Sequence, residues 1–431
     1  MECGFIMPMM PLEGSKKLVP SIGQLHIPTH MTLMTMSFAF MTALVTLAAY
    51  LFSKEPKRMP WTPETILLII FLGWVTFTTF FAFYPQPAWL QWNKILKIQI
   101  MTLLTAMLVT DRKRLEGLVW VITLSLAYYG VKGGIFTILH GGVHRVQGPA
   151  STFIEGNNEM GLALIMTVPL LRYLHLQVQN KLIRLLVATS MVLTGLAAIG
   201  TQSRGALLAA VAMSSLLWLK SRNKVTTAFY IIAAVGLIAA IMPQEYWARM
   251  NTIKTYEQDA SAMGRINAWH TAFNLAKDRI TGGGFETFRA PTFEQYAPDP
   301  NNVHDVHSIY FEVMGEHGFI GFGLFVLIGL LAWWTGSRVI RECRKDPDRK
   351  WAADLAAMTQ VSMIGFATGG AFLGLAYFDY YYHLVIILVL TYQIAVKNAW
   401  GTLEQGKPAE FDAAKATPGE RLAHKQRMRL P

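Results

Sequence analysis

Residues 185–219 read LLVATSMVLTGLAAIGTQSRGALLAAVAMSSLLWL, and Arg204 is the one charged residue in this apolar run. A membrane-spanning helix needs ~20 mostly apolar residues, so the run is long enough for two spans joined by a tight turn. An arginine does not lose its charge, and we therefore expect Arg204 at the end of a span, facing water, a partner or an anionic ligand. A simpler interpretation is an interfacial arginine that snorkels towards water.

The whole chain shares this apolar character. Of its 431 residues, 53% are hydrophobic and 15% are charged, and the mean hydropathy is +0.33. Soluble domains usually carry ~25% charged residues, so the composition argues against a soluble enzyme. The apolar content is also too high for a disordered chain. The two cysteines, Cys3 and Cys343, provide neither a disulfide framework nor a cysteine metal site.

Windows free of Asp, Glu, Lys and Arg predict the membrane spans. They cover 31–53, 65–93, 98–110, 117–131, 160–171, 185–203, 205–219, 225–244, 318–337, 355–378 and 380–396. We expect the fourth window to continue past Lys132 to Leu139, which places a charge at membrane depth, where charges are usually functional or paired. The sequence therefore predicts an all-α, polytopic helical bundle with about 11–12 spans.

Basic residues predict the orientation of the spans. They cluster at 54–58, 111–114 and 338–350 and after residue 397, and the positive-inside rule assigns these segments to the cytoplasm. The net charge of +11 then reflects membrane orientation, and we expect no nucleic-acid partner. The predicted organisation is an atypical N-terminal segment (1–30), membrane helices (31–244), one large outer loop (245–306), membrane helices (307–400) and a basic cytoplasmic tail (401–431).

The outer loop should fold, because its 261–280 segment has apolar residues at helical spacing, including Ile266, Trp269 and Phe273. Long ordered loops are usually functional. We interpret the glycines 282–284 as a turn, since the spacing of a dinucleotide-binding motif is absent.

Two histidines lie where the loop meets the next span, in the stretch PDPNNVHDVHSIYFEVMGEHGFIG (298–321). With an ordinary pKa of ~6.5, a histidine here could act as a general base, although a plain interfacial histidine is the simpler reading. A metal site built from His304, Asp305 and His307 is less favoured, because the spacing is common and further ligands are not evident. We expect Ser308 to cap the following helix.

Further polar residues fall on the same predicted side. Arg265 lies in MGRINAW (263–269), where it could simply form a surface ion pair with Glu257 or Asp259. The segment 144–161 offers Arg145, Asn157 and Asn158, in what could be an ordinary polar turn. Arginines suit bidentate recognition of phosphate oxygens. Several arginines beside a histidine at the outer face would fit a lipid carrying a pyrophosphate.

Seven segments together resemble the O-antigen ligase and polymerase superfamily, most closely the exosortase-A-associated O-glycosylation ligases. They are YGVKGGIF (129–136), GPASTFIEGNNEMGLAL (148–164), QSRGALLA (202–209), DASAMGRINAW (259–269), GGGFETF (282–288), YAPDPNNVHDVHSIYFEVMGEHGFIG (296–321) and GGAFLGLAYFD (369–379).

This resemblance implies a multi-pass enzyme of the bacterial inner membrane, with its active site and large loop in the periplasm. Such ligases move a glycan from undecaprenyl pyrophosphate to an acceptor without a metal or another cofactor. The resemblance assigns catalysis to His307, Arg204 and Arg265. Position 308 is Ser where many relatives have Asn. The residues expected to bind substrate are Arg145, Lys132, Asn158, Arg249, His304 and Tyr310.

The expected mechanism is a direct, inverting displacement in which His307 takes the proton of the acceptor hydroxyl. Arg204 and Arg265 would hold the pyrophosphate and stabilise the charge that develops as it leaves. The acceptor stays open between lipid A core, a protein and another glycan. Alternatives are a polymerase that extends a lipid-linked chain, a transporter of lipid-linked glycans, and a metal-dependent hydrolase built on His304 and His307. Candidate charges gathered at one face favour an enzyme over a transporter.

Overall fold

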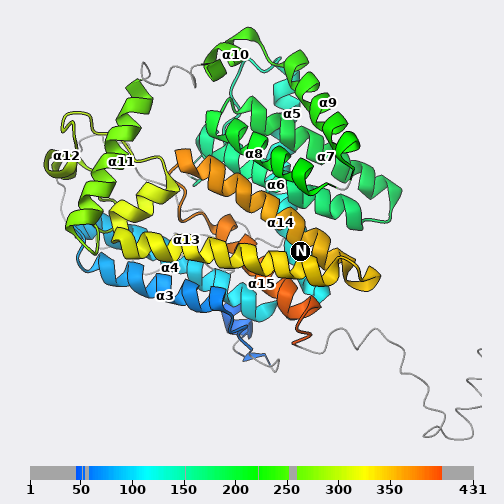
Figure 1. The fold of residues 1–431 in the computed structure, drawn as a ribbon, viewed down its shortest axis with the longest axis horizontal. Coiled ribbons are helices and arrows are strands. Elements are labelled where there is room, and N and C mark those ends of the chain that lie inside the picture. The colour runs from blue at the N-terminus through cyan, green and yellow to red at the C-terminus, as the bar shows by residue number, and fades with distance from the viewer. Residues whose placement is uncertain are drawn as a thin grey trace, which may run out of the picture.

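The structure is a computed structural model that describes residues 45–50, 52–53, 58–150, 152–221, 223–251 and 260–399. The predicted N-terminal segment 1–30, the tail 401–431, most of the first predicted span and the two suggested partners of Arg265 lie outside these residues. Within them the chain forms helices and no strand (Figure 1). The helices are α3 (Pro63–Thr79), α4 (Pro85–Leu108), α5 (Arg112–Leu139), α6 (Asn157–Gln177), α7 (Lys181–Gly200), α8 (Arg204–Lys220), α9 (Lys224–Ile241), α10 (Gln244–Asn251), α11 (Ala260–Asp278), α12 (Ala290–Tyr296), α13 (Ile309–Cys343), η2 (Pro347–Arg349), α14 (Lys350–Gly369), η3 (Gly370–Phe372) and α15 (Asp379–Ala395).

Six helical segments in the described part of the chain are long and apolar enough to cross a membrane. They are Arg112–Leu139, Asn157–Gln177, Lys181–Gly200, Lys224–Ile241, Ile309–Cys343 and Pro347–Phe372, and α3 is a shorter apolar helix. The chain is therefore an all-α, polytopic membrane protein, as predicted. The number of spans, 11–12, stays a prediction.

One predicted span boundary is wrong. The window 65–93 does not form one helix, because α3 ends at Thr79 and α4 begins at Pro85. Proline is favoured in the first turn of a helix and cannot continue a preceding one, and it sets this boundary. The intervening residues 80–84 are largely aromatic, so an apolar count alone hides the turn.

Close backbone contact holds α5 against α7. A Cβ added at Gly134 would collide with the carbonyl group of Leu193, and one at Gly130 would collide with the Thr194 side chain. Small residues four apart allow membrane helices to approach closely and gain van der Waals contact. The glycines of the YGVKGGIF segment therefore have a packing role.

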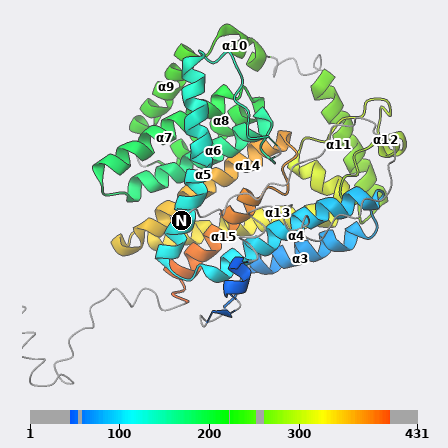
Figure 2. The ribbon, with the colours of Figure 1, turned by 180° about the vertical axis from the view of Figure 1, so that it is seen from behind.

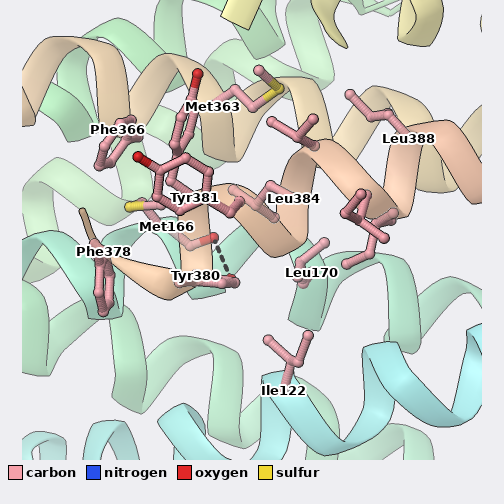
Figure 3. Packing of buried hydrophobic residues seen from close by; sticks show 14 of the residues in the cluster. Ile122, Met166, Leu170, Met363, Phe366, Phe378, Tyr380, Tyr381, Leu384 and Leu388 are labelled. Atoms are coloured by element: carbon pink, nitrogen blue, oxygen red, sulfur yellow. Dashed lines mark hydrogen bonds between the residues drawn. The ribbon is translucent and has the colours of Figure 1, made fainter. Parts of the chain in front are cut away.

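The centre of the bundle is α15, which is buried along nearly its whole length against α13, α14, α3, α4 and α5. Figure 3 shows the ring of Tyr381 stacked on Phe366, with centroids 4.4 Å apart. The Tyr380 hydroxyl donates to the carbonyl oxygen of Met166 at 3.2 Å, so a polar group in this core has a partner. Figure 2 shows α3 and α4 running together along one side of the molecule.

Contacts between helix termini define two ends of the bundle. At the first, Arg112 lies over the Trp351 ring at 4.7 Å and the Lys220 ammonium donates to Gln360 at 2.7 Å. The basic segments 111–114 and 338–350 include helix termini at this end, which we call the basic end. At the opposite end, Asn157 donates to the Thr201 carbonyl at 2.9 Å. The predicted catalytic residues lie here, and we call it the site end.

Candidate functional site

Helix α11 fixes the loop that precedes α13. The Asn267 amide donates to the carbonyl groups of Asp299 and Asn302, at 2.8 and 2.9 Å, and accepts from the Asp299 amide at 3.0 Å. The Trp269 indole donates to the Val306 carbonyl at 2.8 Å, and its ring stacks on Phe311 of α13. Two side chains of the MGRINAW segment thus anchor both ends of the 299–306 loop.

Gly264 lets the loop approach α11 closely. A Cβ at this position would lie 2.5 Å from Nδ1 of His304, so the imidazole packs directly on the helix backbone. That nitrogen is buried and has no hydrogen-bond partner among the described residues. His304 is therefore half-buried beside Arg265, the residue that follows Gly264.

His307 occupies a strained turn immediately before α13. Its φ is +39°, a left-handed conformation that is uncommon for residues other than glycine. Such strain persists only where the surroundings over-determine it, and it clusters at functional sites. On either side of His307, Val306 and Ser308 are buried, which holds the turn. Ser308 occupies the N-cap position, but its buried side chain makes no capping hydrogen bond, so the predicted side-chain cap is wrong.

The charges around His307 come from three separate segments. Its Nδ1 lies 3.5 Å from Oδ2 of Asp305. Burial is the largest influence and lowers the pKa of His307 below its ordinary value. The negative charges of Asp305 and Glu159 raise this pKa, while Arg265 and His304 lower it further. Arg265 and His304 therefore lie close enough to His307 to act on its pKa, and burial favours the neutral imidazole. A neutral imidazole is the form that can accept a proton.

The three glycines at 282–284 form the predicted turn, which docks onto α13. The amides of Gly283 and Gly284 donate to the carbonyl groups of Gly315 and Glu316, at 2.9 and 2.8 Å. α13 is kinked at this point, where Gly318 has φ +68° and ψ −174°. A Cβ at Gly318 would collide with the Ile280 carbonyl group. The contact separates the first turns of α13, beside the site, from the long apolar part of the helix.

Arg204 begins α8 and is half-buried. The Ser203 hydroxyl caps the helix by accepting from the Ala206 amide at 3.2 Å. The next residue, Gly205, faces the end of α14, since a Cβ there would lie 3.4 Å from the Gly369 carbonyl oxygen. The same end of α14 contacts the start of α13, because the Tyr310 hydroxyl donates to the Ala367 carbonyl at 2.8 Å. The segments that carry Arg204 and His307 therefore both contact the C-terminal end of α14.

The Asn157–Asn158 turn lies between these parts of the site. Asn157 donates to Thr201, next to the Arg204 turn, and Glu159 acts on the pKa of His307. Asn158 is half-buried in the same first turn of α6. The segment is therefore more than an isolated polar turn.

Four other predicted residues have different surroundings. Tyr310 uses its hydroxyl within the bundle, as described above. Arg249 is half-buried on α10, whose Tyr246 packs with Leu207 of α8. Arg145 is exposed. Lys132 is also exposed, and its ammonium lies 5.4 Å from the Tyr128 ring centroid on the same helix.

Two glutamates of α13 bind distant segments, and no motif in the sequence singles them out. Glu312 accepts from the Ala376 amide at 3.0 Å. Glu316 accepts from the Tyr377 hydroxyl at 2.6 Å and from the Glu286 amide at 2.8 Å. These bonds tie the loop after η3 and the glycine turn to α13. Their partners lie 30–64 positions away, so only the fold reveals them.

Among the described residues, no group of three or more His, Cys, Asp or Glu side chains could hold a metal ion.

Comparison with known families decides the class of the protein. Residues 189–326 match the family model described as O-antigen ligase. The chain contains an O-antigen ligase domain. This match confirms the predicted superfamily and supports a membrane ligase or polymerase type of function acting on glycans. The match covers Arg204, Arg265 and His307 together.

A second match covers residues 26–179 and is described as a family of unknown function (DUF5935). Lys132, Arg145 and Asn158 fall within it. No curated protein matches the chain. The closer resemblance to exosortase-A-associated ligases stays a prediction.

Proposed function

We propose that the protein transfers a glycan from undecaprenyl pyrophosphate to an acceptor hydroxyl on the periplasmic side of the bacterial inner membrane. One observation carries the proposal: the O-antigen ligase match contains Arg204, Arg265 and His307, and Arg265 acts electrostatically on His307 across 42 positions of sequence.

The proposed reaction is a single displacement. The acceptor oxygen forms a bond to the anomeric carbon as the bond from that carbon to the pyrophosphate oxygen breaks. His307, whose neutral form is favoured by burial, takes the hydroxyl proton. Arg204 and Arg265 bind the pyrophosphate and stabilise its growing negative charge. The products are an inverted glycoside and undecaprenyl pyrophosphate, and the scheme requires no metal.

The charge pattern supports the proposed orientation. The basic end, with Arg112, Lys220 and Arg338, would lie in the cytoplasm, and the site end would then face the periplasm. A cysteine introduced by Ala290→Cys in α12 should react with an impermeant thiol reagent added from the periplasmic side. Reaction only after the inner membrane is permeabilised would overturn this orientation.

The test of the activity is a reconstituted assay with undecaprenyl-pyrophosphate glycan and three acceptors: lipid A core, a protein and a second lipid-linked glycan. We expect transfer that survives EDTA. His307→Ala should slow transfer by ~10²–10⁴-fold, the usual contribution of a general base, with little change in donor affinity. His270→Ala, on the exposed face of α11, is the matched control and should leave the rate unchanged.

Other results would change the assignment. A near wild-type rate for His307→Ala with an inactive His304→Ala would identify His304 as the base. Full activity of both variants would show that this junction is structural. Transfer only onto the second lipid-linked glycan would identify a polymerase.

A further inference from the structure

The orientation of His307 points to a second residue. An imidazole has two distinct nitrogens, and the hydrogen bond made by one decides whether the other can accept a proton. Nδ1 of His307 lies 3.5 Å from Oδ2 of Asp305, two positions earlier in the chain. A proton on Nδ1 that faces this carboxylate would leave the lone pair of Nε2 for a reacting hydroxyl.

The backbone of the turn brings these two side chains together. The Oδ1 atom of Asp305 accepts from the Val306 amide at 2.8 Å, so one carboxylate oxygen is fixed by the turn itself. The Val306 carbonyl is held in turn by Trp269 of α11. The left-handed conformation of His307 then directs its ring back towards Asp305. The second oxygen, Oδ2, is the one near the ring.

The Asp305 carboxylate also borders the loop after η3. A Cβ added at Gly374 would lie 3.6 Å from Oδ2 of Asp305 and 3.8 Å from Oε2 of Glu312. Glu312 secures this loop through the Ala376 amide. Elements on both sides of the turn therefore define the position of Asp305, although its side chain is 62% exposed.

We propose that Asp305 is a positioning residue for the transfer reaction, holding the Nδ1–H of His307 so that Nε2 takes the acceptor proton. This inference rests on the proposed function. The separation of 3.5 Å exceeds that of a well-formed hydrogen bond. Catalytic hydrogen bonds are often long before substrate binds and shorten in the complex. We therefore expect the pair to tighten when the donor and acceptor occupy the site.

The charges around His307 indicate what the Asp305 carboxylate would stabilise during proton transfer. The charged and titratable groups that act on His307 are Asp305, Arg265, Glu159 and His304. Proton transfer creates an imidazolium beside the positive Arg265. A carboxylate at Nδ1 offsets that repulsion, as a carboxylate does for the histidine of a serine-protease triad. Glu159 acts in the same direction, but among the residues that the structure describes only Asp305 lies within ion-pair distance of the ring.

The experiment measures glycan transfer against pH for Asp305→Asn, with Glu294→Gln, at an exposed acid on α12, as the matched control. Asparagine keeps an oxygen that can accept from the Val306 amide, so the turn should survive. Loss of the orienting carboxylate lowers the rate of a buried catalytic triad by ~10⁴-fold. Because Asp305 is exposed, we expect its loss to lower the plateau rate by on the order of 10–100-fold. Asp305→Glu should recover part of the loss. Glu294→Gln should leave the plateau rate near wild type.

The pH dependence separates positioning from a structural role. The Asp305 carboxylate raises the pKa of His307, so Asp305→Asn should move the acid limb of the rate profile to lower pH. The pH at which His307 loses reactivity towards diethyl pyrocarbonate, followed by mass spectrometry, should move in the same direction. A variant that merely loosened the fold would lower the rate without this directed shift.

Double substitution distinguishes the failure of this inference from the failure of the proposed function. In a His307→Ala background, Asp305→Asn should cause no further loss, because Asp305 acts through His307. A further loss as large as that of the single variant would overturn the inference, as would a wild-type profile for Asp305→Asn when His307→Ala is slow. Wild-type transfer by His307→Ala would instead overturn the proposed function.

Discussion

The basic end and the site end of the bundle hold their charges in different ways. At the basic end, the ion pairs join residues three or four positions apart on one segment, as in Arg112–Glu116 at 2.7 Å and Arg349–Asp346 at 2.6 Å. At the site end, many polar contacts also join distant segments, as in the Tyr377 hydroxyl bond to Glu316 across 61 positions.

This difference separates charges that serve topology from charges that serve chemistry. A local pair forms wherever its helix forms, and exposed pairs of this kind contribute little to stability. Aromatic rings hold other cations of the basic end, as Trp333 holds Lys220 and Tyr392 holds Arg338. At the site end, His307 and Arg265 meet only when α11, the 299–308 loop and α13 are packed together.

The largest difference between the two ends is expected for substitution of Arg265. We expect Arg265→Ala to weaken donor binding and to slow transfer by ~10²–10³-fold, because it removes a donor to a developing negative charge. Arg265→Lys should recover only part of this, since lysine keeps the charge and loses the two-pronged contact. Arg338→Gln, at the basic end, is the matched control, and transfer should persist. Donor affinity and transfer rate are measured for each variant, and equal losses at both ends would show that the distinction is wrong.

A second prediction concerns the kink that sets α13 against the glycine turn. Gly318→Ala forces a side chain into a conformation that is essentially restricted to glycine, and it also meets the Ile280 carbonyl group. We expect the free energy of unfolding to fall by roughly 1–3 kcal/mol, read from thermal unfolding in detergent. Gly323→Ala is the control, because a Cβ there has no atom within 4 Å. An unchanged melting temperature for Gly318→Ala would show that the kink is not needed for stability.

The smallest effect is expected at the basic end. Lys350 and Asp354 form an ion pair at 2.6 Å, and the lysine side chain is 62% exposed. Lys350→Gln should change the free energy of unfolding by ~0–1 kcal/mol, with a difference that shrinks as salt is added. The transfer rate should be unchanged. A large loss of activity would give this end a role in catalysis and contradict the comparison.

The sequence predicts the location of a polar residue best where that residue lies next to the start or end of an apolar run. His304 and His307 stand three positions apart in one segment, and their position before α13 followed from the start of an apolar run. Arg204 was also identifiable, because a charge between two apolar runs must lie at a helix end. By contrast, Lys132 sits inside the apolar α5, and its placement over Tyr128 away from the packed glycine face depends on helix rotation.

The sequence by itself determined the class of fold and the division of charge along the chain. Membrane helices need long apolar segments, and this requirement can be read without knowing which helices touch. The predicted span 65–93 is wrong at the aromatic turn between α3 and α4. Apolar composition indicates which segments can lie in lipid, but it does not mark where a helix ends. Basic loops could likewise be grouped by charge alone.

Only the tertiary structure decided which polar groups meet at the site end. The sequence offers Asp305 only as a less favoured metal ligand and gives Glu159 no role, yet both act on the pKa of His307. Electrostatic interactions depend on distance and burial, which follow from the packing of helices far apart in the chain. The left-handed turn at His307 has the same origin, because no local preference favours it and the packing of α11 and α13 holds it.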